Sequence, residues 1–347
     1  MFSFLKKKTL FIPLYNEIAA NIMAGKILTP DGNKFSRHTA YNYQTGAFRF
    51  LFYEKEKGKI YLENINKQWA EKFVIFLMEK GYCKNSIAVT LARLKAVLRR
   101  LYNNGIGTYN GHGIRAGNEV VTSVYTTLDE LKLLLEADFT ETPGLAKVRD
   151  VYVLQCFIGL RFADLAIVLK NPKQFIKDEA GKRFFEIKTQ KTGEVVIIPL
   201  AKVVKEILVK YDYDFGKLFS YQYYNREIKN MAEISGIKTE VVFTRTQGGL
   251  RTDQVRLKTE LMSSHTARRT FATNAFLSDL PIKNIMLITG HKTTSSFDRY
   301  VRCSNLDAAI KIANHPFFHI EMPVSLTLPE DVSLSNEHSI SLLQQSK

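Results

Sequence analysis

Cysteine is scarce in this chain, and its scarcity limits the scaffolds and sites that the protein can build. The 347 residues include 3 cysteines, Cys83, Cys156 and Cys303, which stand far apart and show no metal-ligand spacing. Disulfide-stabilised scaffolds need dense, paired cysteines, and structural zinc sites need closely spaced Cys and His ligands. The sequence therefore predicts neither a disulfide framework nor a zinc site.

Long apolar runs are missing as well. A membrane-spanning helix needs at least about 18 consecutive apolar residues, and no stretch of the sequence approaches that length. The segment from Met1 to Phe11 carries three lysines, but it lacks the apolar region and the small-residue cleavage site of a secretory signal. We expect a soluble, intracellular protein without a membrane partner.

Acidic residues are outnumbered by basic ones, which points to a polyanionic partner. The chain has 34 Asp and Glu against 49 Lys and Arg, for a net charge of +15. Residues 1–110 carry 18 basic and 7 acidic residues, so a net charge of +11 lies in the N-terminal third. Such an excess is typical of proteins that bind nucleic-acid phosphates. A soluble basic domain without that partner has the same composition, so charge alone does not decide between them.

A set of polar residues in the C-terminal two thirds is suited to attack on a phosphodiester without a metal ion. In chain order the set comprises Arg161, Lys191, His265, Arg268, His291 and Tyr300. Negative charge grows on the non-bridging phosphate oxygens during attack, and planar guanidinium groups match it with paired hydrogen bonds. The two arginines can thus supply the electrostatic stabilisation that a metal supplies elsewhere.

Each remaining member of the set has a chemical task. A tyrosine hydroxyl has an ordinary pKa of about 10, so Tyr300 must lose its proton as it attacks, and His265 or His291 can accept that proton. A lysine in a mobile turn can protonate the departing deoxyribose oxygen. Lys191 lies in a predicted turn, and Lys188 is the alternative. Taken singly, each residue has an ordinary structural explanation, so only their order and combination carry the prediction.

The order and spacing of these six residues resemble the catalytic set of the tyrosine recombinases, the phage integrase family. The resemblance extends from about Thr127 to Phe317. It implies that the six residues form the active site and that Asp164, three residues after Arg161, is a supporting acidic residue that orients it.

The resemblance also implies a function and its partners. It indicates a site-specific DNA recombinase that cleaves and rejoins duplex DNA for integration, excision or inversion. Cleavage would leave a 3′-phosphotyrosine at Tyr300 and a free 5′-hydroxyl. The enzyme would act as a homo-tetramer on two paired sites of double-stranded DNA, with accessory DNA-bending proteins as further candidate partners. Its expected place is the cytoplasm, at the nucleoid, as part of a mobile genetic element, and no metal or nucleotide cofactor is expected.

Two other functions fit the same residues. A type IB topoisomerase shares the chemistry but would relax supercoiled DNA without pairing two sites. A DNA-binding regulator would keep these residues in a non-catalytic role, and a covalent protein–DNA adduct would exclude it. The target sequence and the choice among integration, excision, inversion and resolution are not encoded in the pattern.

Residues 1–110 predict a helical domain of the core-binding type, within a fold that is mainly α with a small β-sheet. Helices are expected near residues 13–23, 37–52, 66–78 and 85–103. Apolar residues in the last of these helices recur at the 4-3-4-3 spacing of one buried face. They are Ile87, Leu91, Leu94, Leu98 and Leu101. The basic residues on its other faces are candidates for contact with DNA: Arg93, Lys95, Arg99 and Arg100.

A linker is expected at residues 111–124, because five glycines fall between positions 105 and 118. Residues 125–318 are expected to form a mixed α/β catalytic domain of the recombinase type. Its first helix should begin at the capping box of Thr127 and Glu130.

Within this second domain, two short β-rich runs at 183–189 and 194–199 predict a hairpin with Lys191 in its turn. From Val203 onward we expect helices to dominate. One of these, Met262 to Leu277, should carry His265 and Arg268 on the same face.

A further helix and a tail are expected after Tyr300. Ser304 and Asp307 predict a capping box, and Leu306, Ile310 and Ala313 predict a short apolar stripe. By resemblance the stripe should dock on a neighbouring protomer, and docking on its own domain is the alternative. The tail at 319–347 has four acidic residues against one lysine and is expected to be mobile.

Overall fold

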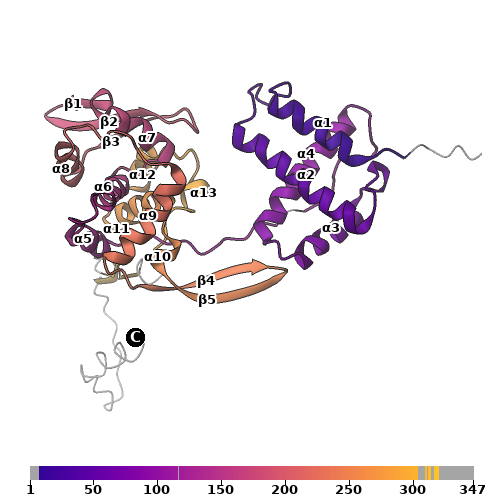
Figure 1. Ribbon diagram of the computed structural model, residues 1–347. Helices are drawn as coiled ribbons and strands as arrows, with labels where there is room; N and C mark the ends of the chain where they lie inside the picture. The colour runs from indigo at the N-terminus through magenta and orange to yellow at the C-terminus, as the bar shows by residue number, and fades with distance from the viewer. Residues whose placement is uncertain (1–7, 116, 304–308, 311, 314–315, 320–347) are drawn as a thin grey trace, which may run out of the picture.

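The computed structural model describes residues 8–115, 117–303, 309–310, 312–313 and 316–319. Its ribbon forms two lobes joined by an extended segment, and each lobe has its own buried apolar cluster (Figure 1). Helices dominate both lobes, and the strands belong to the second lobe. The expected fold class, mainly α with a small β-sheet, is confirmed.

The first lobe is built from four amphipathic helices. They are α1 (Phe11–Met23), α2 (Arg37–Lys57), α3 (Lys67–Glu79) and α4 (Lys84–Asn103), with a 3-10 turn, η1, at Leu62–Asn64. The side chains of Ser36 and Asn66 each accept a hydrogen bond from a backbone N–H three residues on, which starts α2 and α3. The predicted apolar face of α4 is buried. All four expected helices are thus confirmed.

Aromatic rings fill the centre of the first lobe. The rings of Phe50 and Phe73 stack with centroids 5.1 Å apart, among other ring contacts in the same core. The hydroxyl of Tyr15 donates to the carbonyl of Tyr43 over 3.0 Å. It lies so close to Gly46 that a methyl group at that position would collide with it. Large rings bury much apolar area per residue, so a small lobe gains a well-packed core.

The second lobe combines nine helices with a three-stranded sheet, within the part of the chain that the structure describes. The helices are α5 (Leu128–Glu136), α6 (Pro143–Ile158), α7 (Phe162–Lys170), α8 (Lys202–Lys210), α9 (Tyr221–Ile234), α10 (Lys258–Leu261), α11 (Ser264–Leu277), α12 (Ile282–Thr289) and α13 (Thr294–Phe297). The sheet is antiparallel in the order β1 (Ile176–Glu179), β2 (Lys182–Lys188) and β3 (Val195–Pro199), with 3-10 turns η2 (Pro172–Phe175) before it and η3 (Pro316–His319) near the end of the described chain. The capping box at Thr127 and the β2–β3 hairpin are both confirmed.

Helix α6 is the central element of this lobe. Nearly all of its side chains between Val148 and Ile158 are buried, as expected for a helix enclosed by neighbours. No single described helix is long and apolar enough to span a membrane, and α6 and α7 would suffice only as a pair, bent by 111°.

Helices dominate after Val203 as expected, but two strands that the sequence did not predict interrupt them. Strands β4 (Glu240–Gln247) and β5 (Leu250–Leu257) form an antiparallel hairpin that reaches from the second lobe toward the first (Figure 1). Their side chains are exposed or half-buried throughout. Without a buried face the hairpin lacks the strict alternation of apolar and polar residues that identifies a strand in sequence.

Contacts from distant segments hold this hairpin. The hydroxyl of Thr122 donates to the carbonyl of Val242 (3.2 Å) and accepts from the backbone N–H of Thr244 (3.0 Å). Glu119 accepts from the backbone of Thr246 (2.8 Å). At the tip, the N–H of Gly248 donates to a backbone carbonyl of the first lobe. The hairpin therefore ties the connecting segment and the first lobe to the second.

The predicted elements after Tyr300 fall largely outside the described residues. Ser304, Asp307 and Leu306 lie there, and so does the predicted tail apart from His319. Ile310 is described and is 63% exposed in the single chain. Where the apolar stripe docks stays a prediction.

Candidate active site

Arg161 is positioned by the sharp connection between α6 and α7. Gly159 ends α6 in the left-handed conformation (φ 66°), and an added Cβ there would stand 2.6 Å from the ring of Phe271. Only glycine fits such a close approach at positive φ. Arg161 follows as the residue that precedes α7. Its Nη1 is buried and has no hydrogen-bond partner among the described residues.

Arg268 is held inside the lobe by backbone carbonyls. It lies on α11 and is 1% exposed. Its Nη1 donates to the carbonyl of Gly159 (2.7 Å), and its Nη2 donates to the carbonyl of Thr289. Its Nε is left without a partner in the described structure. Burial, and next the charge of Arg161, lowers the pKa of Arg268 to about 10.

His291 is fixed by the end of α12 and by a chain of hydrogen bonds. Gly290 ends α12 in the left-handed conformation (φ 65°). The Nε2 of His291 lies 3.3 Å from Nη2 of Arg268, which can only donate. Nε2 must therefore accept, and the proton of the neutral ring must be on Nδ1. Nδ1 then donates to the hydroxyl of Thr289 (2.8 Å), which in turn donates to the carbonyl of Ile285 (2.6 Å).

Three of the predicted site residues surround the ring of Tyr300. The ring centroids of His291 and His265 lie 4.6 Å and 5.4 Å from that of Tyr300. The guanidinium carbon of Arg268 lies 5.2 Å from the same centroid. Residues that are 35 positions apart in sequence, from His265 to Tyr300, thus meet at one point.

Both histidines are neutral near pH 7. Burial, and next the charge of Arg269, lowers the pKa of His265 to about 4. Burial, and next the charge of Arg268, lowers the pKa of His291 to about 3. A neutral imidazole offers a lone pair, so each histidine can accept a proton or a hydrogen bond at neutral pH.

Lys191 lies at the exposed tip of the β2–β3 turn, and Asp164 anchors that turn. Asp164 is 2% exposed, and its Oδ1 accepts a hydrogen bond from the backbone N–H of Gln190 over 2.8 Å. The charge of Lys191 contributes to the lowered pKa of His265 and of His291, which places the lysine beside the site. The alternative, Lys188, is the last residue of β2 and is exposed.

The structure brings the whole predicted set together. His265, Arg268 and His291 lie against the ring of Tyr300. Besides burial, the charges of Arg161 and Lys191 lower the pKa of both histidines, so these two residues lie near the same point. Asp164 supports the turn that carries Lys191. No group of three or more His, Cys, Asp or Glu residues that could hold a metal ion occurs among the residues that the structure describes.

Comparisons with known proteins point to one fold. Residues 16–113 match the family model of the phage integrase SAM-like domain. The lambda integrase tetramer bound to a Holliday junction is similar with a TM-score of 0.63 at 16% identity, over 86% of this chain and 78% of that chain. The chain has the fold of the tyrosine recombinases.

Two further solved structures of this fold are similar to the chain. The XerH site-specific recombinase in a post-cleavage complex with a palindromic difH substrate has a TM-score of 0.58 at 13% identity, over 88% of this chain and 84% of that chain. The Tn1549 transposon integrase in complex with circular intermediate DNA has a TM-score of 0.56 at 14% identity, over 87% of this chain and 98% of that chain. No curated protein matches the chain in sequence.

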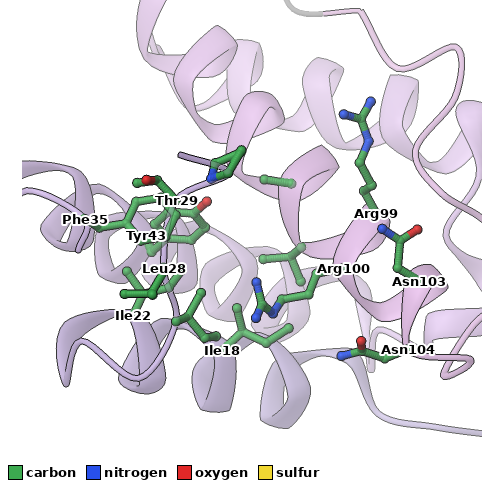
Figure 2. Close-up of a pocket in the computed structure, with 14 residues that line it drawn as sticks. Ile18, Ile22, Leu28, Thr29, Phe35, Tyr43, Arg99, Arg100, Asn103 and Asn104 are labelled. Carbon is green, nitrogen blue, oxygen red and sulfur yellow. The ribbon is translucent and has the colours of Figure 1, made fainter. Parts of the chain in front are cut away.

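The four candidate DNA-binding residues on α4 have different surroundings. Arg93 is half-buried, with its guanidinium 5.1 Å from the ring centroid of Tyr43, and Lys95 packs against Gly111. Arg99 and Arg100 are exposed near the end of α4. They line a pocket of about 520 Å³, into which Arg100 reaches while Arg99 points away (Figure 2).

Sequence reasoning missed two residues near Tyr300. Arg269 follows Arg268 on α11, and Arg302 follows two residues after Tyr300. Both line a pocket that also includes Tyr300. Their adjacency to motif residues was the available signal, but on a helix neighbours point in directions about 100° apart, so adjacency alone does not show that they share a site.

Proposed function

We propose that the protein is a site-specific DNA recombinase that cleaves and rejoins duplex DNA through a covalent bond to Tyr300. The observation that carries this proposal is the enclosure of the Tyr300 ring by two neutral histidines and a buried arginine. In this proposal the first lobe and residues 125–318 are the core-binding and catalytic domains that hold the duplex.

The unpartnered guanidinium atoms bind the phosphate. Arg268 uses both of its terminal nitrogens on carbonyls, so its Nε remains, and Arg161 offers Nη1. Buried donors without partners are costly, and phosphoryl oxygens between the two arginines would satisfy both. Because neither arginine has to reorganise, their charge stabilises the negative charge that builds up during attack.

His265 accepts the proton of Tyr300. Both nitrogens of His291 are engaged, one with Thr289 and one with Arg268. His265 has no hydrogen-bond partner for its ring among the described residues, and its pKa of about 4 keeps it neutral at pH 7. His291 instead orients Arg268 through its Nε2.

The covalent step is balanced by two proton transfers. The Tyr300 oxygen bonds to phosphorus while its proton passes to His265, and the bond from phosphorus to the 5′ oxygen breaks. Lys191 protonates that leaving oxygen. The 3′-phosphotyrosine retains the energy of the broken bond, so a 5′-hydroxyl from a second strand can reverse the steps and reseal the DNA without ATP.

The similar proteins support the same function and its assembly. They include a lambda integrase tetramer on a Holliday junction, a XerH recombinase after cleavage and a transposon integrase on circular intermediate DNA. We extend to this chain the binding of duplex DNA and assembly as a tetramer on paired sites.

The proposal is tested with a DNA site that the protein itself selects. The Tyr300→Phe protein is used to select duplexes from a random pool, and nicked versions of these duplexes then trap the wild-type protein. We expect a covalent adduct with the wild type, with and without a chelator, and none with Tyr300→Phe, which should bind with similar affinity because the hydroxyl contributes little to binding. The control Tyr221→Phe alters a 51% exposed tyrosine of the same lobe and should keep the adduct.

An adduct formed by Tyr300→Phe would refute the assignment of the nucleophile, and no adduct with any variant would refute catalysis. Sequencing of DNA junctions from the reaction separates recombination from relaxation. Relaxed plasmids without exchanged junctions would assign the chemistry to a topoisomerase.

A further inference from the structure

A second cationic pocket lies beside the candidate active site and shares His265 and Tyr300 with it. Its volume is about 370 Å³, and its walls come from α11, the segment around Tyr300, the segment that connects the lobes and Asn85 of α4. Three arginines line it: Arg269, Arg299 and Arg302. The mechanism above uses none of them.

Three buried polar atoms around this pocket lack hydrogen-bond partners in the described part of the chain. The Nε atoms of Arg269 and Arg302 are buried, and neither has a hydrogen-bond partner among the described residues. The hydroxyl of Ser123, which lines the same pocket, is in the same state. Buried donors without acceptors destabilise a fold, so three of them around one cavity indicate that an acceptor is to be supplied from outside.

The positive charge of the pocket is poorly balanced. Burial lowers the pKa of Arg269 and of Arg302, and the charge of Arg302 further lowers that of Arg269. Glu119 is the one acidic residue among the described residues that line the pocket. One of its oxygens already accepts a hydrogen bond from the backbone of Thr246 (2.8 Å). A bound anion would therefore relieve repulsion as well as satisfy donors.

The cations continue past the connecting segment. A neighbouring cavity of about 550 Å³ shares Glu119, Ser123 and Arg302 with the first pocket and adds the cations Lys84 and Arg251. Two adjoining pockets with cations in their walls, the first of them at Tyr300, match a ligand whose negative charges repeat along a line. Nucleic-acid backbones have this property.

We propose that Arg269 and Arg302, together with Ser123, bind the DNA phosphate next to the one that Tyr300 attacks. This inference rests on the proposed function, because it takes duplex DNA as the ligand. Guanidinium groups suit phosphate oxygens through paired hydrogen bonds. The pocket borders His265 and Tyr300, so a neighbouring phosphate of the same strand lies within reach when the scissile phosphate is in place.

Phosphate binding here also positions the nucleophile. The hydroxyl of Thr273 donates to the carbonyl of Tyr300 (3.3 Å) and accepts from the backbone N–H of Arg302 (2.9 Å). Tyr300 and Arg302 are therefore tied to the same point of α11. A phosphate held by Arg302 fixes the segment that carries the tyrosine, so Arg269 and Arg302 are positioning residues.

The test combines arginine variants with single neutral phosphates. In the Tyr300→Phe background, a double variant combines Arg269→Gln and Arg302→Gln. The control is Arg183→Gln, which removes one charge at the end of β2 that lies away from the Lys191 turn, where Arg183 bonds to Asp178. Binding is measured to the selected duplex and to copies in which one phosphate at a time is a methylphosphonate. Because this background cannot form an adduct, the result does not depend on catalysis.

We expect the double variant to bind less tightly and to lower the slope of log affinity against log salt by about 0.9 for each phosphate that it no longer neutralises. One methylphosphonate beside the scissile position should weaken DNA binding by the parent protein and leave binding by the double variant unchanged. The melting temperature of the double variant should not fall, since two mutually repelling charges have been removed. The proposal would be overturned if the double variant and each methylphosphonate weakened DNA binding independently at every position. It would also be overturned if the double variant lost no more affinity than Arg183→Gln.

Two further measurements separate the causes of failure. In the first, inorganic phosphate is added and the melting temperature is measured. If phosphate stabilises the parent but not the double variant, and no methylphosphonate affects the two proteins differently, the pocket binds a free anion and the DNA assignment is refuted. With Tyr300 restored, Arg302→Gln should slow adduct formation at saturating DNA, and an unchanged rate would refute the positioning role. Absence of an adduct with the wild type would count against the proposed function, while the binding measurements would still decide the pocket.

Discussion

Asp164 offers the sharpest test of how the turn lysine is positioned. Its buried carboxylate accepts the N–H of Gln190 over 2.8 Å, at the turn that carries Lys191. We expect Asp164→Ala to release this turn and slow cleavage, since Lys191 would reach the leaving oxygen less often. Asp164→Asn keeps an oxygen acceptor of the same size and should have a smaller effect.

The magnitude follows from the strength of that hydrogen bond. A hydrogen bond to a charged group contributes about 1.5–3 kcal/mol, and each 1.36 kcal/mol changes a rate about tenfold. If the whole contribution serves to hold the turn, Asp164→Ala slows cleavage about 10- to 160-fold. A neutral acceptor retains about 0.5–1.5 kcal/mol, so Asp164→Asn should slow cleavage by about 5- to 13-fold.

The assay is single-turnover adduct formation at saturating DNA, on a normal substrate and on one whose bridging 5′ oxygen is sulfur. Sulfur leaves without protonation, so a defect that acts through Lys191 should recover on the sulfur substrate. Lys191→Ala should recover in the same way, and Asp178→Asn, an exposed acid of β1, should be normal on both substrates. A defect in Asp164→Ala that persists with sulfur would mean that Asp164 acts on the arginines, and the reasoning would be refuted.

Two other predictions follow from the charges. The folded pKa values of about 4 for His265 and about 3 for His291 lie below the ordinary histidine value of about 6.5. Between the folded and the ordinary values, the unfolded chain binds more protons than the folded chain. The free energy of unfolding therefore decreases as pH falls from about 6.5 toward these folded values. Calorimetry from pH 7 to 5 should show a smaller fall in melting temperature when both histidines are replaced by Gln, and equal falls would contradict the lowered pKa values. Replacing exposed Arg99 and Arg100 by Gln should weaken DNA binding and lower its salt slope by up to about 0.9 for each phosphate involved. Arg93→Gln, which alters an arginine packed on a ring, should change the slope less, and unchanged slopes in all variants would remove this end of α4 from the DNA interface.

The residue types and their order were readable from the sequence because the chemistry demands them. Attack on a phosphodiester without a metal needs guanidinium groups, a proton acceptor, an acid and a nucleophile, and few combinations of side chains supply all four. The helices of the first lobe and the β2–β3 hairpin were also predictable, since each has a strong local pattern. In α4, for example, the spacing from Ile87 to Leu101 matches the observed buried face.

Tertiary structure decided the features that depend on partners far away in the chain. The β4–β5 hairpin has no buried face of its own, and contacts from Thr122 and Glu119 hold it in place. The proton on His291 is assigned by Arg268 and by Thr289, which no local pattern connects to it. Such contacts arise only when the chain has closed on itself.

The two arginines beside Tyr300 show the same division between sequence and structure. In sequence, Arg269 and Arg302 are two cations among 49. Folding brings them together around one cavity, buries their Nε atoms and leaves one carboxylate to face them among the described residues. The sequence by itself therefore determined which chemistry is available, whereas burial and desolvation, which exist only in the folded chain, determined which cations need an anion.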